Sequence, residues 1–214
     1  MLKKVAYHAV ICAAITLLGM PIGAATLHYE GYVAGARVGT ATVNVSIAQA
    51  GYRVWGSAAA DGVANWFSDW HSDFSASGGL VDGAPQLLAY SYNQRDRDSI
   101  RDVHVADGKV SYKKNQRPVR KTRAFPTPDL VSALFVKPRC RETWWVNTGR
   151  RNYRLERRVG APGVCRYEVF DRHEKSFKID LVLAEREGIT VPLSLTVHAL
   201  LRARLILVDE APKL

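Results

Sequence analysis

Residues 41–47 read Ala-Thr-Val-Asn-Val-Ser-Ile, and apolar and polar side chains alternate along the whole stretch. Successive side chains of a β-strand point to opposite faces, so this period of two predicts a strand that is buried on one face. Ala50-Gly51 interrupts the pattern, and residues 52–60 resume it. The two stretches therefore predict a β-hairpin, and they set the fold class for the rest of the chain.

The same alternation returns further along the chain. Residues 103–106 lead into Asp107-Gly108, a pair favoured in tight primed turns, and residues 109–114 form the predicted return strand. Residues 177–183 and 191–197 alternate on either side of Glu187-Gly188, and residues 202–208 follow as a last strand. We expect roughly ten short strands with the turn spacing of sandwiches and barrels. The prediction is an all-β fold with one short helix, built as a curved antiparallel sheet of half-barrel or barrel-like form.

The one helical segment follows residue 127. Thr127 is the predicted cap, Pro128 suits the first helical position, and Asp129 favours the positive end of the helix dipole. Apolar residues then recur at helical spacing, at Leu130, Val131, Leu134 and Phe135. Lys137-Pro138 ends the helix. So short a helix needs tertiary packing, and we expect it across the concave side or the open end of the sheet.

Residues 1–25 have the pattern of a cleaved signal peptide. Lys3 and Lys4 precede an apolar run over residues 5–20, and Gly23-Ala24-Ala25 places cleavage after Ala25. A retained membrane anchor is the alternative, but the apolar run is short for a span. The remaining chain is predicted as one β-rich domain over 26–210 with a C-terminal tail over 211–214, and without a transmembrane segment.

Export to the periplasm or the medium decides how the cysteines and the net charge are interpreted. Cys140 and Cys165 are the two cysteines left after cleavage, and in an oxidising compartment they predict a disulfide, with a reactive or metal-binding pair as the alternative. Loss of two lysines with the leader lowers the formal net charge from +10 to +8. The polyanions of an envelope are anionic lipid, lipopolysaccharide and acidic polysaccharide, so these, rather than nucleic acid, are the expected partners.

Several segments together resemble an exported bacterial family, catalogued as domain of unknown function 3108. They are residues 32–39 (Tyr-Val-Ala-Gly-Ala-Arg-Val-Gly), residues 51–54, Pro85, residues 128–134 (Pro-Asp-Leu-Val-Ser-Ala-Leu) and residues 191–193. The resemblance implies a secreted or periplasmic curved β-sheet, akin to half-barrels that carry lipids or lipoproteins. It implies no reaction and transfers no catalytic residue.

Basic residues interleaved with tryptophans supply the predicted binding site. Guanidinium groups bind phosphate, and indole rings suit the boundary between polar and apolar surroundings. The candidate ligand-binding residues are Arg117, Arg120, Arg123, Arg139, Arg141, Trp144, Trp145, Trp66 and Trp70. The alternatives are a solvated cationic face for the arginines and ordinary core positions for the tryptophans.

No pattern indicates catalysis. Asp69, His71 and Asp73 alternate like the polar face of a strand, which favours a solvated face over a metal site, although their clustering with Glu142 would suit a hydrolase. Ser132 follows Asp129 by one helical turn without a paired base, so packing or capping is the favoured role. We therefore expect no catalytic residue, no metal and no cofactor.

Three functions remain open at this level. The first is a non-enzymatic periplasmic protein that binds an apolar or anionic amphiphilic envelope ligand in the curved sheet. The second is an interaction or scaffold component of an envelope assembly, which would bind another envelope protein. The third is a hydrolase that acts on envelope polymers.

Overall fold

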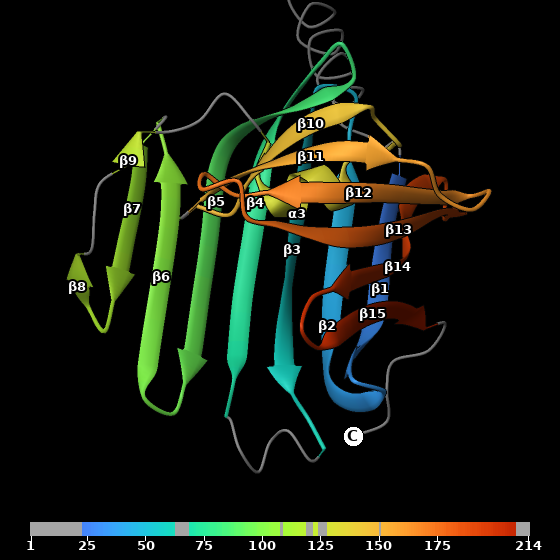
Figure 1. Cartoon of the computed structure of the whole chain (residues 1–214). Coiled ribbons are helices and arrows are strands. Elements are labelled where there is room, and N and C mark those ends of the chain that lie inside the picture. The colour runs from blue at the N-terminus through green and yellow to red at the C-terminus, as the bar shows by residue number, and fades with distance from the viewer. Residues whose placement is uncertain are drawn as a thin grey trace, which may run out of the picture.

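The computed structural model describes residues 23–62, 69–107, 109–118, 122–123, 128–149 and 151–208, with side chains not described at 122–123. Over these residues, Figure 1 shows strands around one short helix, α3 (Leu130–Phe135). The strands are β1 (Gly23–Val33), β2 (Ala36–Ile47), β3 (Gly51–Ala60), β4 (His71–Val81), β5 (Ala84–Asp96), β6 (Ser99–Ala106), β7 (Lys109–Lys114), β8 (Arg117–Pro118), β9 (Thr122–Arg123), β10 (Thr143–Asn147), β11 (Asn152–Arg158), β12 (Val164–Phe170), β13 (Ser176–Arg186), β14 (Ile189–His198) and β15 (Arg202–Val208).

All strands belong to one antiparallel sheet with the order β10-β11-β12-β13-β14-β15-β1-β2-β3-β4-β5-β6-β7-β8, and β9 also pairs with β7. Neighbours in the sheet are neighbours in sequence, except that the last strand, β15, pairs with the first, β1, and that β9 pairs with β7. Over the described residues the end strands β10 and β8 do not pair, so the sheet remains open. The predicted all-β class and curved antiparallel architecture are confirmed.

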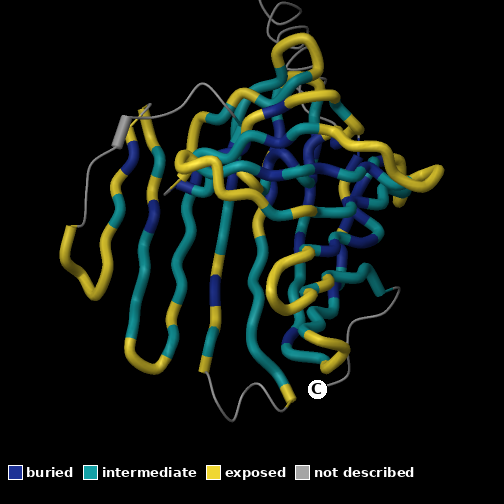
Figure 2. The backbone as a smooth tube through the Cα atoms, in the orientation of Figure 1, coloured by how far each residue is buried: buried dark blue, intermediate teal, exposed yellow. Residues whose placement is uncertain are grey.

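The sheet folds over itself and traps the helix. Figure 1 shows β10–β13 running across β1–β5 with α3 between the two groups, and α3 contacts β14 and β10 on one side and β3, β4 and β5 on the other. We call β1–β8 the N-terminal half and β10–β15 the C-terminal half. Burial is concentrated where the two halves cross (Figure 2). The expected position of the helix, on the concave side of the sheet, is confirmed.

The inner face of the N-terminal half forms a filled core. Val45, Val54, Ala76 and Tyr90 lie opposite one another across four strands, and each is at most 6% exposed. Phe135 of α3 packs edge-on against Tyr29, with ring centroids 5.9 Å apart. Side chains buried in this way contribute about 1.5–3 kcal/mol each relative to exposure.

The two halves meet at a corner between β14 and β1. Tyr29 is fully buried, and its hydroxyl donates to the carbonyl oxygen of Pro192 at 2.9 Å. Pro192 has no N–H, and it lies beside a register shift between Val182 and Leu183, where the ladder with β13 is interrupted. A hydrogen bond thus anchors the corner at a point where the backbone ladder does not.

A second contact joins the β10–β11 turn to β6. Gly149 has φ of +75°, and a Cβ atom there would lie 2.2 Å from Cγ1 of Val103. Glycine is the residue that tolerates both this backbone conformation and this close approach. The turn therefore fixes the end of the C-terminal half against the N-terminal half.

The predicted disulfide is confirmed. Cys140, in the segment after α3, is bonded to Cys165 of β12, with Cα atoms 5.4 Å apart, inside the usual range for disulfides. Cys165 is 1% exposed. The bond ties the exit of the helix to the centre of the C-terminal half.

Several local predictions hold and two need correction. The hairpins around Asp107 and around Glu187-Gly188 form as predicted, the latter with positive φ at both turn residues. The strand estimate was wrong, because the described residues hold 15 strands, several of them 10 to 13 residues long. The helix cap was also wrong: Asp129 is the N-cap and accepts a hydrogen bond from the Ser132 N–H, whereas Thr127 lies outside the described residues.

The leader and domain boundaries stay predictions. Residues 1–22 and 209–214 lie outside the described residues. Strand β1 begins at Gly23 and Ala25 is 7% exposed, so the strand extends across the cleavage point predicted after Ala25. Within the described ranges, no helix has the length and apolar character needed to cross a membrane.

Candidate ligand cavity

An apolar cavity of about 260 Å³ lies between α3 and the inner face of β10–β14. Apart from Thr148, every side chain that lines it is aliphatic or aromatic. The lining side chains include Leu130, Leu134, Trp144, Leu155, Ile179 and Leu195. Leu130 is 41% exposed and therefore marks the rim of the cavity. We call this space the inner cavity.

Strand alternation places these side chains. On β10, Trp144 and Val146 point inward and are buried, whereas Trp145 between them is 47% exposed. On β11, Leu155 points inward between Arg154 and Glu156. The helix adds Leu130 and Leu134, four residues apart and therefore on one helical face. The inner cavity exists because two apolar faces cross without filling the space between them.

One polar atom at this cavity lacks a partner. The indole Nε1–H of Trp144 is buried, and no residue in the described part of the chain accepts a hydrogen bond from it. The Trp144 ring packs at a tilt against Tyr167, with centroids 5.9 Å apart. A buried donor without an acceptor costs about 1–3 kcal/mol, and Trp144 Nε1 is the one such side-chain group among the described residues that line the inner cavity.

A second apolar cavity of about 300 Å³ adjoins the first and shares Leu195 and Val197 as lining residues. We call it the outer cavity. Small residues on β1–β3 make room for it, among them Gly31, Gly39, Ala41, Ala58 and Ala59, and Trp70 also lines it. Both cavities therefore border the same two side chains of β14.

A buried polar cluster holds the start of the helix next to the inner cavity. Asp129 is 2% exposed, and its carboxylate accepts from the N–H of Ser132 at 2.9 Å and from the Ser132 hydroxyl. The hydroxyls of Ser132 and Tyr52 lie 2.8 Å apart. A serine hydroxyl has one hydrogen, so the arrangement that satisfies every group has Tyr52 donating to Ser132 and Ser132 donating to Asp129.

Burial dominates the electrostatics of this cluster. Desolvation raises the pKa of Asp129 above its ordinary value, although the hydrogen bonds from Ser132 oppose the shift. Desolvation likewise raises the pKa of Tyr52 to about 12. The fully buried hydroxyl of Ser132 has no histidine among its described partners. The cluster has the geometry of a helix cap tied to β3, in agreement with the structural role predicted for Ser132.

Of the predicted arginines, the three whose side chains are described, Arg117, Arg139 and Arg141, do not line the inner cavity. Arg117 is exposed on β8, at the end of the strand order opposite Trp144 on β10. Arg139 borders a separate, more polar pocket with Glu185, and Arg141 uses its backbone N–H to donate to the Tyr167 hydroxyl at 2.9 Å. Arg120 lies outside the described residues, as does the side chain of Arg123.

The predicted tryptophans divide among several environments. Trp144 lines the inner cavity and Trp70 lines the outer one. Trp145 lies on the opposite face of β10 from Trp144, and Trp66 lies outside the described residues. Two of the four predicted tryptophans therefore line a cavity. Trp144 and Trp145 do not contribute to one common site, because they lie on opposite faces of β10.

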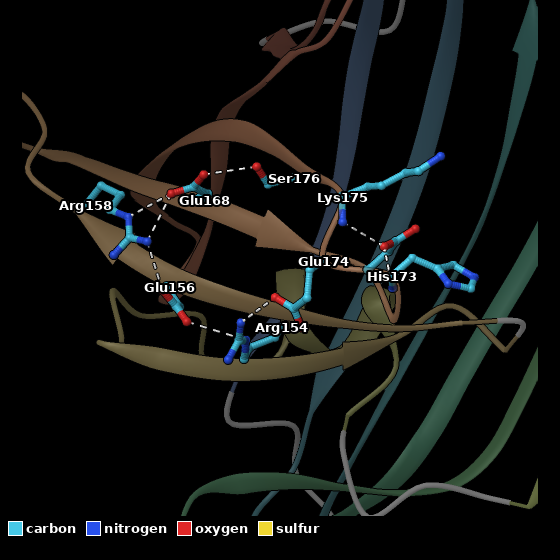
Figure 3. Close-up of polar contacts among 9 residues, drawn as sticks. Arg154, Glu156, Arg158, Glu168, His173, Glu174, Lys175 and Ser176 are labelled. Carbon is cyan, nitrogen blue, oxygen red and sulfur yellow. Dashed lines mark hydrogen bonds and ion pairs between the residues drawn. The ribbon is translucent and has the colours of Figure 1, made fainter.

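Two further arginines, Arg154 and Arg158 of β11, are engaged by carboxylates on the outer face of β11–β13 (Figure 3). Arg158 bonds Glu156 at 2.9 Å and Glu168 at 3.0 Å, and Arg154 bonds Glu156 at 3.4 Å and Glu174 at 3.0 Å. The hydrogen bond from Arg158 is the largest cause that lowers the pKa of Glu168. These arginines are consequently less available to an anionic headgroup than the sequence suggests.

The carboxylate and imidazole trio near residue 71 is solvated, as predicted. His71 and Asp73 are 3.2 Å apart with side chains 48% and 62% exposed, and Asp69 pairs with Arg97 at 3.6 Å. Glu142 pairs instead with Arg157 at 3.0 Å. Among the described residues, no group of three such side chains is arranged to hold a metal ion.

Sequence reasoning missed the residues that shape the cavity most. Leu195 and Val197 were expected only as apolar positions of an alternating strand, yet they line both cavities. The spacing of Leu130 and Leu134 indicated an apolar helix face, but it did not reveal that space would remain beneath it. The alternation on β10–β14 was the usable signal, because it identifies the inward side chains.

Comparison with known proteins assigns neither a family nor an activity to the chain. No protein-family model matches the chain, and no curated protein is significantly similar to it. Among solved structures, it is similar to a β-barrel-like protein of domain of unknown function DUF1849 from Brucella abortus, at 10% identity and a TM-score of 0.48, over 89% of this chain and 98% of that one. The resemblance to domain of unknown function 3108 therefore stays a prediction from the sequence.

Proposed function

We propose that the protein is a non-enzymatic binder of a single-chain amphiphile, whose apolar part occupies the inner cavity. The observation that carries the proposal is a cavity of about 260 Å³ lined almost wholly by aliphatic and aromatic side chains. Ligand sites are apolar clefts of about 300–1,000 Å³ with a few placed polar groups. The inner cavity lies near the small end of that range, which suits one acyl chain or ring system rather than a lipid with several chains.

The unpaired Trp144 N–H refines the ligand class. A carboxyl, ester or hydroxyl oxygen placed beside Nε1 would supply the acceptor that the protein lacks. The adjoining outer cavity supports a longer chain, since Leu195 and Val197 belong to both spaces. A fatty acid or a monoacyl lipid has these two properties.

The cellular setting is part of the proposal. Two features of the sequence support an exported, envelope-located protein: the leader pattern over residues 1–25 and the resemblance to domain of unknown function 3108. The disulfide supports the same setting, because structural disulfides persist in oxidising compartments.

Displacement of a fluorescent fatty acid by dodecanoate, measured on the full chain, tests the proposal. Leu195→Trp should weaken binding at least tenfold, because the larger ring fills space shared by both cavities. Trp145→Ala is the matched control, since Trp145 lies on the other face of β10, and it should bind like the wild type. Absence of binding by the wild type, or equal binding by the Leu195→Trp protein with unchanged circular dichroism, would contradict the proposal.

Trp144→Phe tests the polar contact separately. Phenylalanine keeps a ring against Tyr167 but removes the N–H. We expect this variant to lose affinity for dodecanoate by about five- to tenfold, in line with one hydrogen bond, and to lose little affinity for dodecane. Equal losses for both ligands would show that Trp144 acts through packing alone.

A second candidate function has one specific observation behind it. Strand β10 is an end strand of the sheet, and its Trp145 is 47% exposed. Exposed edge strands pair with extended segments of other proteins. An envelope protein that adds a strand beside β10 would bury Trp145, and Trp145→Ala would then abolish complex formation without affecting dodecanoate binding.

A further inference from the structure

The β14–β15 turn exposes apolar side chains to an unusual degree. Leu200 is 100% exposed and Leu201 is 59% exposed, at the tip between His198 and Arg202. Isolated exposed leucines are ordinary, but two adjacent ones at the tip of a hairpin form a compact apolar projection. Nothing in the described part of the fold packs over Leu200.

Basic side chains border this projection. Arg202 lies directly opposite His198, and His198 lies opposite Lys178, so Lys178 and Arg202 share the row of the sheet next to the tip. Arg204 follows on the same face of β15 as Arg202, and both are exposed. Neither arginine forms an ion pair within the described residues.

The acidic groups nearest in the register are held by other cations. Asp180 accepts two hydrogen bonds from Arg166, at 2.7 and 3.1 Å, and also contacts His198. Glu168, directly opposite Lys178, pairs with Arg158 at 3.0 Å, and Glu30 pairs with Arg37 at 3.2 Å. The adjacent β12–β13 turn has two cations and two anions over residues 171–175 and adds no net charge. The surroundings of the tip therefore favour an anionic partner.

We propose that the β14–β15 turn docks on an anionic phospholipid surface, with Leu200 and Leu201 entering the headgroup region and Arg202, Arg204 and Lys178 contacting lipid phosphates. An apolar tip flanked by cations matches the two components of interfacial binding, apolar burial and attraction to anionic lipids. A bilayer matches the single short tip better than a protein partner does, because a protein interface of ordinary size needs a much larger buried patch.

The turn lies next to the outer cavity, so docking and ligand binding would be linked. Val197 and Ala203, which flank the turn on β14 and β15, line the outer cavity. Docking would therefore bring the outer cavity close to the acyl chains of the membrane. The docking proposal does not depend on the ligand, since the tip and its cations exist whether or not the cavities are filled.

Fluorescence from a polarity-sensitive dye attached at position 200 tests the proposal. The full-length Leu200→Cys protein, in which Cys12 is also replaced by serine, is mixed with vesicles of phosphatidylglycerol and phosphatidylethanolamine, or of phosphatidylcholine alone. We expect a blue shift with the anionic vesicles that weakens at high salt. Val159→Cys is the matched control, because Val159 is 96% exposed in another turn, and its dye should not shift. Equal shifts at both positions, or none at position 200, would overturn the proposal.

Vesicle sedimentation adds a second readout. Leu200→Ser with Leu201→Ser should reduce binding to anionic vesicles about tenfold or more, and Arg202→Gln about fivefold. Val159→Ser should bind like the wild type. Any binding due to the residues before position 23 is common to all variants and cancels in the comparison. Unchanged binding of the double variant would contradict docking through this turn, while its dodecanoate affinity reports separately on the cavity.

Discussion

The inner faces of the two halves follow the same alternation but are packed differently. In the N-terminal half, Val45 and Val54 are at most 1% exposed, and α3 places Phe135 and Val136 directly against that core. In the C-terminal half, Leu155 and Leu181 are equally hidden from solvent, yet a cavity remains between them and the helix. Alternation thus determines which side chains point inward, whereas the crossing of the halves around α3 determines whether they fill the space.

The largest difference is expected from truncating one buried side chain at the inner face of each half. Phe135→Ala should lower the free energy of unfolding by about 3–5 kcal/mol, because it opens a hole in a filled core. Leu155→Ala should cost about 2 kcal/mol, at the low end for such changes, because Leu155 already borders empty space. Urea unfolding followed by circular dichroism measures both. Equal losses would show that the two faces are packed alike.

The disulfide is expected to stabilise the C-terminal half, in which the inner cavity lies. Replacing Cys140 and Cys165 by serine is expected to lower the free energy of unfolding by about 3 kcal/mol, from the loop-closure entropy of 25 residues. Reduction of the wild type should reproduce the urea midpoint of the variant. A midpoint unchanged by both treatments would mean that the bond does not contribute.

Asp129 links the halves through the helix cap, and its ionisation gives a signed pH effect. Since its folded pKa is raised above the ordinary 3.8, the folded state holds the proton more tightly than the unfolded state. The stability contribution is therefore fully present below 3.8 and is lost as the pH rises through the folded pKa. Asp129→Asn keeps the cap and removes this slope, whereas Asp129→Ala should cost about 2 kcal/mol.

The urea midpoints of the wild type and of Asp129→Asn, each measured from acid to neutral pH, check this effect. The difference between the two proteins isolates Asp129 from Asp171, Asp180 and Glu168, whose pKa values are lowered and which act in the opposite direction. Parallel pH profiles would rule out Asp129 as the titrating group.

The smallest effect is expected on the outer face of the C-terminal half. Arg158→Gln removes contacts to Glu156 and Glu168, but Arg158 is 45% exposed, so the loss should be under about 1 kcal/mol. The difference from wild type should shrink at high salt. A loss as large as that of Leu155→Ala would mean that the ion pairs, rather than the inner face, stabilise this half.

The sequence predicted what depends on local pattern. The β2–β3 hairpin, the bounds of β7 and the inward residues of β13 follow from alternation and turn residues alone. The position of Trp144 and Trp145 on opposite faces follows from the same rule, but the clustering of charge in the sequence obscured it.

What could not be predicted depends on contacts between different elements of the fold. Arg154 and Arg158 find Glu174 and Glu168 on neighbouring segments, so their charge is compensated only in the fold. The inner cavity arises where α3 meets β10–β14, and no local spacing encodes the gap between them. Asp129 took the cap position in place of Thr127 because its carboxylate reaches the Ser132 N–H.

Methyl NMR during titration with dodecanoate tests the central claim most directly. We predict that the methyl resonances of Leu155, Ile179 and Leu195 shift and saturate together, while those of Val43, Val45 and Val54 in the filled half stay in place. Shifts spread equally over both halves, or no shifts at saturating dodecanoate, would contradict a ligand cavity in the C-terminal half.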